Sequence, residues 1–579
     1  MSTSPAVPAT LHQATAANQP TGIGWALGGV AAALPWLLPT HAEPWTTFHS
    51  EMLAAVVLLA LAVWALCAGQ GRWALDVLAA GFLLVACVPA VQAWSGLFVF
   101  PLEAWLIGLY LAGIATAVAV ARRAEELAPQ RVPDALFAGL AMAAILSTGM
   151  ALYQWLGLDA LGLMVAPPLV GGRPAANVGQ PNNLSTLLVW GLIALWWGYQ
   201  RRRLGGAVAV LGAAFLLLGV ALTQSRTGWM AVALLGLAAV LGRRVLGTGP
   251  QAKVFAGLAL WFVLAVLVRE PAGQALLGAA SSTLGDQVAV GKRPAIWMLA
   301  LEGIGRSPWW GYGWNQSVQA HVLLASGYPG LHVSVAHAHN VVLDLMLWNG
   351  LPLGLLLVAG LGAWFWYQLR GASTPAQQLL LLALAVFGLH AMLELPHAYA
   401  FFLLPAALMM GALNAARPVA VLCRLPRAVV ALVIAGQAVL LALMFDDYTR
   451  VEQDLAAYRM RMARIGDLRP RPSPDLRVLQ PLQSALESLR TEPRRNMSPD
   501  ELARMRRVLT RYPSAEGLFR YAQASAINGR PDEADWALKL LCSMHRIESC
   551  EAAAMDWAAA AADGHPEMKR VTVPSAATR

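Results

Sequence analysis

The sequence predicts an all-α polytopic membrane protein with about 13 transmembrane helices, followed by a C-terminal α-helical domain. Of its 579 residues, 58% are hydrophobic and only 13% are charged, whereas about a quarter of the residues of an average soluble protein are charged. The hydrophobic residues come in runs of roughly 17 to 25, the length that crosses a hydrocarbon core about 30 Å thick. A single soluble domain is excluded, because its core cannot bury so much apolar surface.

Thirteen apolar segments separated by short polar turns are the expected spans. Tryptophans such as Trp25, Trp94 and Trp229 lie near the ends of the runs, which suits the headgroup interface. The spans are expected near residues 22–40, 50–69, 74–92, 100–120, 133–156, 183–199, 204–222, 227–242, 253–268, 340–367, 376–394, 398–415 and 427–445.

The basic residues between the spans predict the orientation. Alternate loops carry about 14 Lys and Arg residues, whereas the short loops of the other set carry only Arg173 and Arg226. Because cytoplasmic loops are enriched in Lys and Arg, residues 1–21 are expected to form a cytoplasmic tail, and segments 269–339 and 446–579 to be periplasmic. The tail lacks the basic start of a cleavable signal peptide, so the first helix should remain as an anchor. The predicted location is the cell inner membrane, with multiple passes.

The chain therefore divides into the tail, a membrane domain over 22–445 that includes the loop 269–339, and a periplasmic helical domain over 446–579. Within the last part, residues 512–541 predict two amphipathic helices joined by a turn, a pattern that resembles one tetratricopeptide-type repeat. An unspecialised helical hairpin is the alternative.

Two of the five cysteines, Cys542 and Cys550, fall in this polar C-terminal part. They are too far apart to pair on one straight helix, so a disulfide between them requires an intervening turn. No Cys pair has a zinc-like spacing.

Five polar clusters all fall on the predicted periplasmic side, next to apolar runs. Polar groups are costly in or beside a membrane, and their gathering at one face indicates a functional site there. The clusters are NVGQPNN with Gln180 and Asn182, TQSRTGW with Arg226, the pair Lys292 and Arg293, HAHN with His337, His339 and Asn340, and ELPHAY with Glu394, His397 and Tyr399.

Arg226 and Arg293 are candidates for binding a phosphate group, because a guanidinium offers planar, bidentate recognition. The alternative for Arg226 is a side chain that snorkels from a helix end to the interface. The alternative for Arg293 is a solvated loop charge, and the adjacent Lys292 is a further candidate.

The histidines of the large loop allow three interpretations. The first is that His332, His337 and His339 ligate a metal in an extended loop, but no carboxylate or cysteine completes a ligand set there, and no metal or other cofactor is predicted. Packing at a helix start is the second interpretation. General acid-base chemistry is the third, because histidine titrates near neutral pH.

Taken together, these motifs resemble the membrane-embedded glycan transferases that include O-antigen ligases, O-antigen polymerases and bacterial protein O-oligosaccharyltransferases. The resemblance spans roughly residues 170–410. In the ligases a His-Asn pair is followed by nine residues and a Gly, which His339, Asn340 and Gly350 match. This match favours His339 over His337.

Two motifs point to the transferases that glycosylate pilins. Gln180 matches their functional glutamine and Tyr399 their functional tyrosine. A thirteenth span followed by a helical periplasmic domain is similar to the same subgroup. Leu353 departs from the ligase pattern, which more often has Gly, Thr or Tyr there.

The resemblance implies metal-independent transfer of an oligosaccharide from a polyprenyl-diphosphate carrier to Ser or Thr hydroxyls of a periplasmic protein such as pilin. Arg226 and Arg293 would hold the diphosphate, and His339 would accept the hydroxyl proton. The residues expected to position substrate are Gln180, Tyr399 and Asn340, with His337, Asn182 and Lys292 as further candidates.

Other functions stay open at this point. The same chemistry with another acceptor gives an O-antigen ligase acting on lipid A core, or an O-antigen polymerase. A transporter of lipid-linked glycan is the alternative from another class, but its ionisable groups would be expected near the bilayer midplane rather than at one face. A nucleic-acid partner is not expected, because many basic residues lie singly or in pairs between apolar runs.

Overall fold

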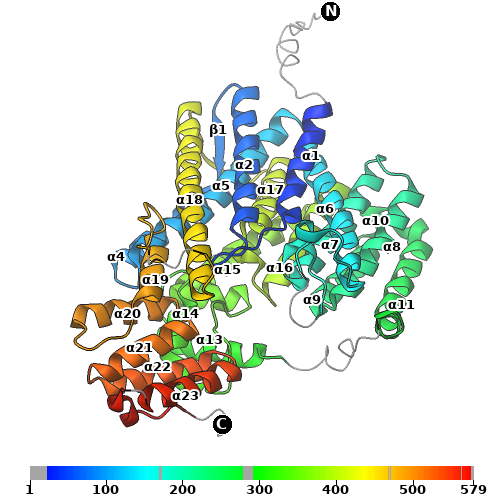
Figure 1. Ribbon diagram of the computed structural model, residues 1–579. Helices are drawn as coiled ribbons and strands as arrows, with labels where there is room; N and C mark the ends of the chain where they lie inside the picture. Colours follow the sequence, from blue (N-terminus) through cyan, green and yellow to red (C-terminus); the bar gives the residue numbers. More distant parts are fainter. Residues whose placement is uncertain are drawn as a thin grey trace, which may run out of the picture.

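The computed structural model describes residues 22–167, 172–277, 291–466, 469, 471–562 and 564–574. They form a bundle of apolar helices with a group of shorter helices at one end (Figure 1). The prediction of a mostly helical, polytopic membrane protein is confirmed. The tail 1–21 and the loop segment 278–290 lie outside the described residues.

The helices of the bundle follow the predicted spans closely. Eight described helical segments are long and apolar enough to cross a membrane, and four shorter helices are also apolar; the count of 13 spans stays a prediction. The predicted span 74–92 is divided into two helices. In chain order the bundle contains α1 (Gly22–Leu37), α2 (Phe48–Ala68), α3 (Val77–Val85), α4 (Val88–Trp94), α5 (Ala104–Leu127), α6 (Arg131–Trp155), α7 (Pro181–Gln200), α8 (Gly206–Thr223), α9 (Arg226–Leu241), α10 (Arg243–Leu246), α11 (Ala252–Leu277), α15 (Val341–Arg370), α16 (Pro375–Ala391), α17 (Ala400–Ala416) and α18 (Arg427–Met462).

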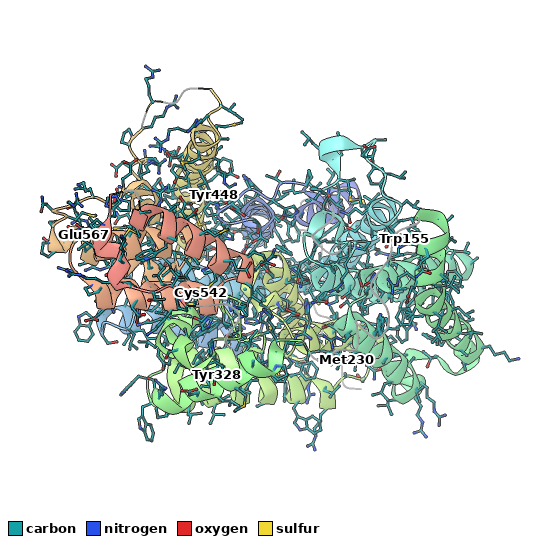
Figure 2. The ribbon with its side chains drawn as sticks, turned by 60° about the horizontal axis from the view of Figure 1, so that its bottom comes forward. Trp155, Met230, Tyr328, Tyr448, Cys542 and Glu567 are labelled. Atoms are coloured by element: carbon teal, nitrogen blue, oxygen red, sulfur yellow. A yellow bond between two sulfur atoms is a disulfide. The ribbon has the colours of Figure 1, made fainter. Side chains whose placement is uncertain are left out.

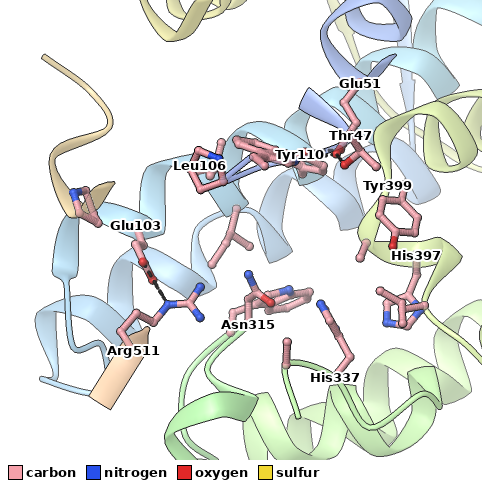
Figure 3. Close-up of a pocket in the computed structure, with 18 of the residues that line it drawn as sticks. Thr47, Glu51, Glu103, Leu106, Tyr110, Asn315, His337, His397, Tyr399 and Arg511 are labelled. Atoms are coloured by element: carbon pink, nitrogen blue, oxygen red, sulfur yellow. Dashed lines mark hydrogen bonds and ion pairs between the residues drawn. The ribbon is translucent and has the colours of Figure 1, made fainter. Parts of the chain in front are cut away.

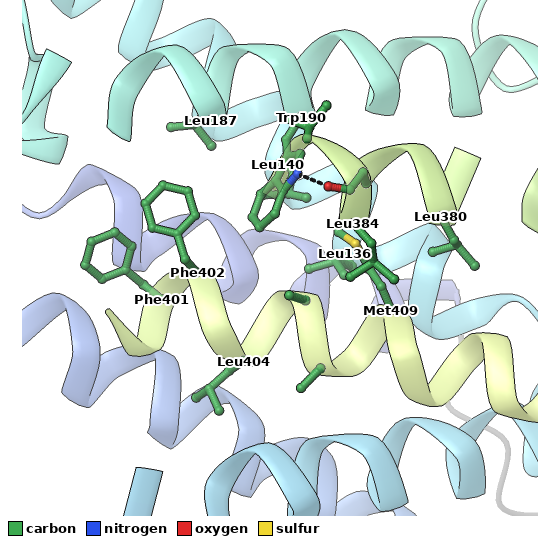
Figure 4. Close-up of a cluster of buried hydrophobic side chains, with 14 of the residues drawn as sticks. Leu136, Leu140, Leu187, Trp190, Leu380, Leu384, Phe401, Phe402, Leu404 and Met409 are labelled. Atoms are coloured by element: carbon green, nitrogen blue, oxygen red, sulfur yellow. Dashed lines mark hydrogen bonds between the residues drawn. The ribbon is translucent and has the colours of Figure 1, made fainter. Parts of the chain in front are cut away.

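The centre of the bundle is held by large side chains of α6, α7, α16 and α17 (Figure 4). Trp190 of α7 is fully buried, and its indole nitrogen donates a hydrogen bond to the carbonyl oxygen of Ala383 at 2.9 Å. Where α17 crosses α5, a Cβ added at Gly411 would lie 2.3 Å from the carbonyl oxygen of Val118. Small residues allow such close contact of backbones in membrane proteins, where packing drives helix association.

Three helices begin at polar residues that the sequence singled out, or beside them. The side-chain oxygen of Gln180 accepts a hydrogen bond from the backbone N–H three residues later at 2.6 Å, and the hydroxyl of Ser225 does the same for α9 at 3.1 Å. Asn340 caps α15 in the same way. These caps satisfy N–H groups that a helix start leaves without partners. They also fix where each helix begins.

One feature departs from the all-α prediction. Strands β1 (Trp73–Asp76) and β2 (Val421–Leu425) pair antiparallel. These short segments follow α2 and α17. The apolar runs of the sequence predicted no strand in either segment. At the end of β1, the buried carboxylate of Asp76 caps α3 and forms an ion pair with Arg122 at 2.9 Å.

The C-terminal part is helical, as predicted. Helix α18 runs without interruption through Asp446, and the division of the chain at that residue stays a prediction. The carboxylate of Asp447 accepts hydrogen bonds from the backbone N–H groups of residues 477, 478 and 479. The following helices are α19 (Gln480–Arg490), α20 (Pro499–Arg511), α21 (Ala515–Ile527), α22 (Pro531–Met544) and α23 (Ile547–Ala562).

The predicted pair of helices in 512–541 corresponds to α21 and α22, which pack as a hairpin. Its likeness to a tetratricopeptide repeat stays a prediction. Cys542 and Cys550 form a disulfide, which the sequence left open. The required turn lies between α22 and α23, at residues 545–546. Figure 2 shows this end of the molecule, with Cys542 and Glu567 far from Trp155 of α6.

The large loop packs into the C-terminal helices. It contains α13 (Arg293–Arg306) and α14 (Ser317–Leu324), and Val318 and Val322 of α14 belong to the same hydrophobic cluster as α20, α21 and α22. The backbone N–H of His332 donates to the carbonyl oxygen of Ser543 at 2.8 Å. Loop and C-terminal helices therefore share one core.

The predicted topology can be tested with reporters fused at four positions. Fusions after Val245 and Gln368 should report the cytoplasm, and fusions after Ser326 and Ser484 the periplasm, because the basic loops lie on the first side. Alkaline phosphatase and green fluorescent protein reporters give opposite signals at each position. A cytoplasmic signal after Ser484 would contradict the predicted orientation of the C-terminal domain.

Candidate active site

The site is centred on the carboxylate of Glu394, which follows α16. Its Oε2 lies 2.7 Å from Nδ1 of His339. Its Oε1 forms an ion pair with Arg293, at the start of α13, and accepts a hydrogen bond from the amide of Asn182 on α7 at 2.9 Å. One buried carboxylate thus joins four segments that are distant in sequence.

The charge of Glu394 is set by competing effects. Burial raises the pKa of its carboxyl, but the hydrogen bond from His339 and the positive charges of His339 and Arg293 outweigh burial and lower the pKa to about 2. Glu394 is therefore ionised at neutral pH. An ionised carboxylate only accepts hydrogen bonds, so Nδ1 of His339 carries the proton that they share.

His339 is held in a defined orientation. Its backbone has a φ of +52°, which few residues other than glycine adopt, and the following Asn340 fixes the turn. Besides capping α15, Asn340 donates through its amide to the carbonyl oxygen of Met392 at 3.1 Å. When the ring is neutral and its Nδ1–H is directed to Glu394, Nε2 is unprotonated and can accept a proton. The His339 side chain is 31% exposed, so a substrate can reach it.

Several arginines surround this pair. Burial lowers the pKa of Arg173; the charge of Glu394 raises it, while Arg226, Arg293 and Arg269 lower it. Each of these charges therefore lies within electrostatic reach of Arg173. Arg173 also donates to the carbonyl oxygen at the end of α8, residue 223, at 3.0 Å.

Arg269 of α11 is a buried cation in this group. Only 4% of its surface is exposed, and among the described residues its two terminal nitrogens have no hydrogen-bond partner. Its charge interacts with that of the adjacent Glu270. Against four guanidinium groups the same region has the buried carboxylate of Glu394 and, beside Arg269, the carboxylate of Glu270. This excess of positive charge favours a multiply charged anion such as a diphosphate.

Hydroxyl and amide groups link the arginine side to Glu394. Ser225, directly before Arg226, donates to the amide oxygen of Asn182 at 2.8 Å and lies 3.0 Å from the hydroxyl of Ser185. Asn182 in turn donates to Glu394. The start of α9 is thereby fixed relative to the carboxylate.

A second polar group lies beside the first. Asp344, in the first turn of α15, accepts a hydrogen bond from the backbone N–H of Ala338 at 2.8 Å and one from Nε2 of His397 at 3.1 Å. Nδ1 of His337 lies 3.5 Å from the same carboxylate. One ligand atom from each of the three side chains lies within 4.8 Å of the others, a geometry that can hold a metal ion.

The predicted site residues separate into three groups. Arg226, Arg293, His339 and Asn182 lie around Glu394, while Gln180 and Asn340 cap the helices that carry the site. Tyr399 begins α17, and its phenol is hydrogen-bonded to the side chain of Asn183. Lys292 is exposed and donates to the carbonyl oxygen of His332 at 3.2 Å.

The side chains of His332, His337 and His339 do not come together as metal ligands. Nδ1 of His332 lies 3.0 Å from the carbonyl oxygen of Cys542, so the side chain faces the C-terminal helices. His337 and His339 pair with different carboxylates, those of Asp344 and Glu394.

Sequence reasoning assigned no role to Glu394, Arg173 or Arg269. A signal was present for two of them, because Glu394 belongs to ELPHAY and Arg173 is one of two basic residues in the short outer loops. Arg269 stands directly after a predicted span, where a snorkelling side chain is the ordinary expectation. Asp344 carried a weaker signal, as an acidic residue near the start of an apolar helix.

Two protein families match the parts of the chain that carry the site. Residues 211–359 match the O-antigen ligase family. Residues 378–560 match the C-terminal region of the family described as virulence factor membrane-bound polymerase. Between them, these matches include Arg226, Arg293, His339, Glu394 and Tyr399.

Two curated proteins of Acinetobacter baylyi are similar to this chain. A general O-oligosaccharyltransferase is 29% identical over 542 residues, which cover 90% of this chain and 92% of that protein. A ComP-specific O-oligosaccharyltransferase is 28% identical over 248 residues, which cover 42% of this chain and 44% of that protein.

The arginine group is tested by Arg226→Lys, which keeps the charge but loses the two-pronged donor geometry. We expect the affinity for a short-chain isoprenyl diphosphate to fall about tenfold, corresponding to roughly one charge-assisted hydrogen bond. Isothermal titration calorimetry on the detergent-solubilised protein measures it. Arg306→Lys is the matched control, because Arg306 pairs with Glu302 on an exposed face of α13. Equal affinities for wild type and Arg226→Lys would mean that Arg226 only snorkels.

Proposed function

We propose that this chain, a protein O-oligosaccharyltransferase of the O-antigen ligase superfamily, transfers an oligosaccharide en bloc from a polyprenyl-diphosphate carrier to Ser or Thr hydroxyls of periplasmic proteins such as pilin. The proposed location is the cell inner membrane, with a cytoplasmic N-terminus and a periplasmic C-terminal domain. One observation carries the proposal: His339, oriented by an ionised Glu394, lies beside a group of arginines. A base and an anion-binding site are the two parts that glycosyl transfer from a diphosphate requires.

In the proposed reaction, Nε2 of His339 accepts the proton of the acceptor hydroxyl. The hydroxyl oxygen attacks the anomeric carbon of the first sugar, a new C–O bond forms, and the bond from that carbon to the diphosphate oxygen breaks. The polyprenyl diphosphate leaves with the electron pair, and the imidazolium later releases its proton to water. Atoms and charge are balanced without a cofactor.

The surrounding groups stabilise this change in charge. Glu394 holds the ring of His339 and favours the imidazolium as it forms, as the carboxylate of a serine-protease triad does for its histidine. Arg173, Arg226, Arg269 and Arg293 are proposed to stabilise the diphosphate as negative charge develops on it. Arg293 pairs with Glu394, so the same side chain reaches both halves of the reaction.

Tyr399 and Asn182 are proposed to orient the sugars. Both are uncharged residues that can form hydrogen bonds. The side-chain amide of Asn182 is already hydrogen-bonded to Glu394, so its burial leaves no unsatisfied donor. Gln180 is proposed to act indirectly, by fixing the start of α7, because its side-chain oxygen caps that helix.

The acceptor is proposed to be a protein for two reasons. The similarity to the general O-oligosaccharyltransferase extends over nearly the full chain, including the C-terminal helices. Those helices pack against the loop that carries His337 and His339. Ligation to lipid A core and polymerisation of O-antigen are the alternatives, and the match to a polymerase family over residues 378–560 makes polymerisation worth testing. A glycan transporter has no use for an oriented base.

The proposal is tested by reconstitution in proteoliposomes with a lipid-linked oligosaccharide and three acceptors: a pilin, lipid A core and a free glycan. Mass spectrometry should find the intact oligosaccharide on Ser or Thr of the pilin. Product on lipid A core or on glycan alone would overturn the choice of acceptor.

Transfer is predicted to be independent of a metal ion, even though His337, Asp344 and His397 have the geometry to hold one. None of these three side chains is needed in the proposed reaction. We expect equal initial rates before and after prolonged treatment with EDTA and 1,10-phenanthroline. A rate that falls with chelator and returns with added zinc would contradict this prediction.

His339 and His337 give a matched pair of variants. His339→Ala should lower the rate of transfer by about a hundred- to ten-thousand-fold, the usual contribution of a general base. His337→Ala should cost much less, because His337 faces Asp344 rather than Glu394. Initial rates are compared at equal amounts of inserted protein. A His339→Ala enzyme with normal activity would remove the base from the mechanism.

A further inference from the structure

A large cavity lies next to the loop that carries His337 and outside the group of residues that contact Glu394. Its volume is about 1600 Å³, above the roughly 300–1,000 Å³ typical of a pocket for a small molecule. His337, His397 and Tyr399 line one wall, and the ion pair between Glu103 and Arg511 lies across from them (Figure 3).

The cavity does not include the proposed diphosphate site. Among the described residues that line it, none is one of the four arginines around Glu394, and neither Glu394 nor His339 is included. The cationic region and the cavity are therefore two separate regions, and His337, which lines the cavity, lies two residues before His339. A transfer reaction needs one region for the donor and another for the acceptor, and the cationic region suits the donor.

The part of the cavity within the bundle is mostly apolar, with Glu51 and Tyr110 as polar groups in its wall. Its walls include α3, α5 and α15, which belong to helical segments long and apolar enough to cross a membrane, and the shorter apolar helix α17. Leu356 of α15 lines the cavity and has 67% of its surface exposed, so this helix offers an occupant an accessible apolar surface. An occupant of this part must be apolar and embedded in the membrane.

The other part of the cavity is lined by residues of the C-terminal part, among which Arg459, Arg511 and Glu516 are charged. Leu482 and Leu486 of α19 line it together with Ser514 and Glu516, at the start of α21. Arg511 donates from Nε to both oxygens of Glu103 at 3.0 and 2.8 Å, which ties α20 to the membrane domain at the edge of the cavity. An occupant that fills the whole cavity is therefore apolar in the bundle and polar beneath these helices.

We propose that the cavity binds the membrane anchor of the acceptor protein: one apolar helix that enters beside α3 and α15 and continues as a polar segment beneath the C-terminal helices. This inference rests on the proposed function. It identifies the acceptor class as proteins that are themselves anchored in the membrane, with the modified Ser or Thr close to the anchor. An isoprenoid tail fits the apolar part but gives no use to the polar part, and its diphosphate belongs with the arginines.

The glycines that line the apolar part allow the cavity to be filled without disturbing the bundle. A Cβ added at Gly360 of α15 meets nothing within 4 Å, and the same holds for Gly362 on the same helix. Gly360 lines the cavity and Gly362 does not. Two residues correspond to about 200° of rotation around a helix, so Gly362 faces away. Gly360→Trp and Gly362→Trp are therefore a matched pair.

The test compares two forms of one pilin acceptor in proteoliposomes: the soluble domain, and the same domain fused to an apolar helix of about 20 residues. Wild type should prefer the anchored form by about a hundredfold in kcat/KM, the lower end of the gain from linking two binding events. Gly360→Trp should lower the ratio of anchored to soluble transfer about tenfold, and Gly362→Trp should leave that ratio unchanged. An equal fall for Gly362→Trp, or no fall for Gly360→Trp, would overturn the proposal.

A second measurement does not depend on transfer. A diazirine at the centre of the fused helix should label α3 or α15 of the wild type on illumination, and Gly360→Trp should abolish that labelling. If labelling occurs as expected but neither acceptor form is glycosylated, the proposed function fails and the anchor site stands. If a diazirine-bearing polyprenyl diphosphate labels α15 and the helix does not, the cavity holds the donor tail and the proposal is wrong.

Discussion

The structure depends on one buried carboxylate with more than one partner. Glu394 accepts hydrogen bonds from Asn182 and His339 and pairs with Arg293. Removing a carboxylate from water is unfavourable unless its oxygens are well satisfied, and these contacts meet that requirement. They also determine the chemistry, because a carboxylate that stays ionised fixes the tautomer of His339 and keeps the base within reach of a cation. Stability of the fold and preorganisation of the site thus come from the same contacts.

The bundle makes this arrangement possible by starting helices where the polar residues lie. Gln180, Ser225 and Asn340 each satisfy the backbone of a helix start, and each stands within two residues of a group that contacts Glu394 or the arginines. A membrane helix cannot leave its first N–H groups without partners in an apolar environment, so a polar start is required in any case. The site uses that requirement to place its side chains.

The sequence predicted the helices well, because apolar runs and the need to satisfy the backbone in a membrane leave few alternatives. It also selected His339, Arg226 and Arg293, since each belongs to a polar cluster beside an apolar run. It gave no role to Glu394, whose partners are 55 residues away at His339 and 212 residues away at Asn182. Such contacts are set by how helices pack rather than by any local pattern. For the same reason the pairing of β1 with β2 and the cavity were not predicted.

The central claim is that His339 and Glu394 act as one unit in proton transfer. A double-mutant cycle measures this directly, from the transfer rates of wild type, His339→Ala, Glu394→Gln and the double variant in the same proteoliposomes. If the two residues act together, the double variant should be hardly slower than His339→Ala alone, because Glu394 has no ring left to orient. Losses that multiply would contradict the account and assign Glu394 a separate task, such as holding Arg293.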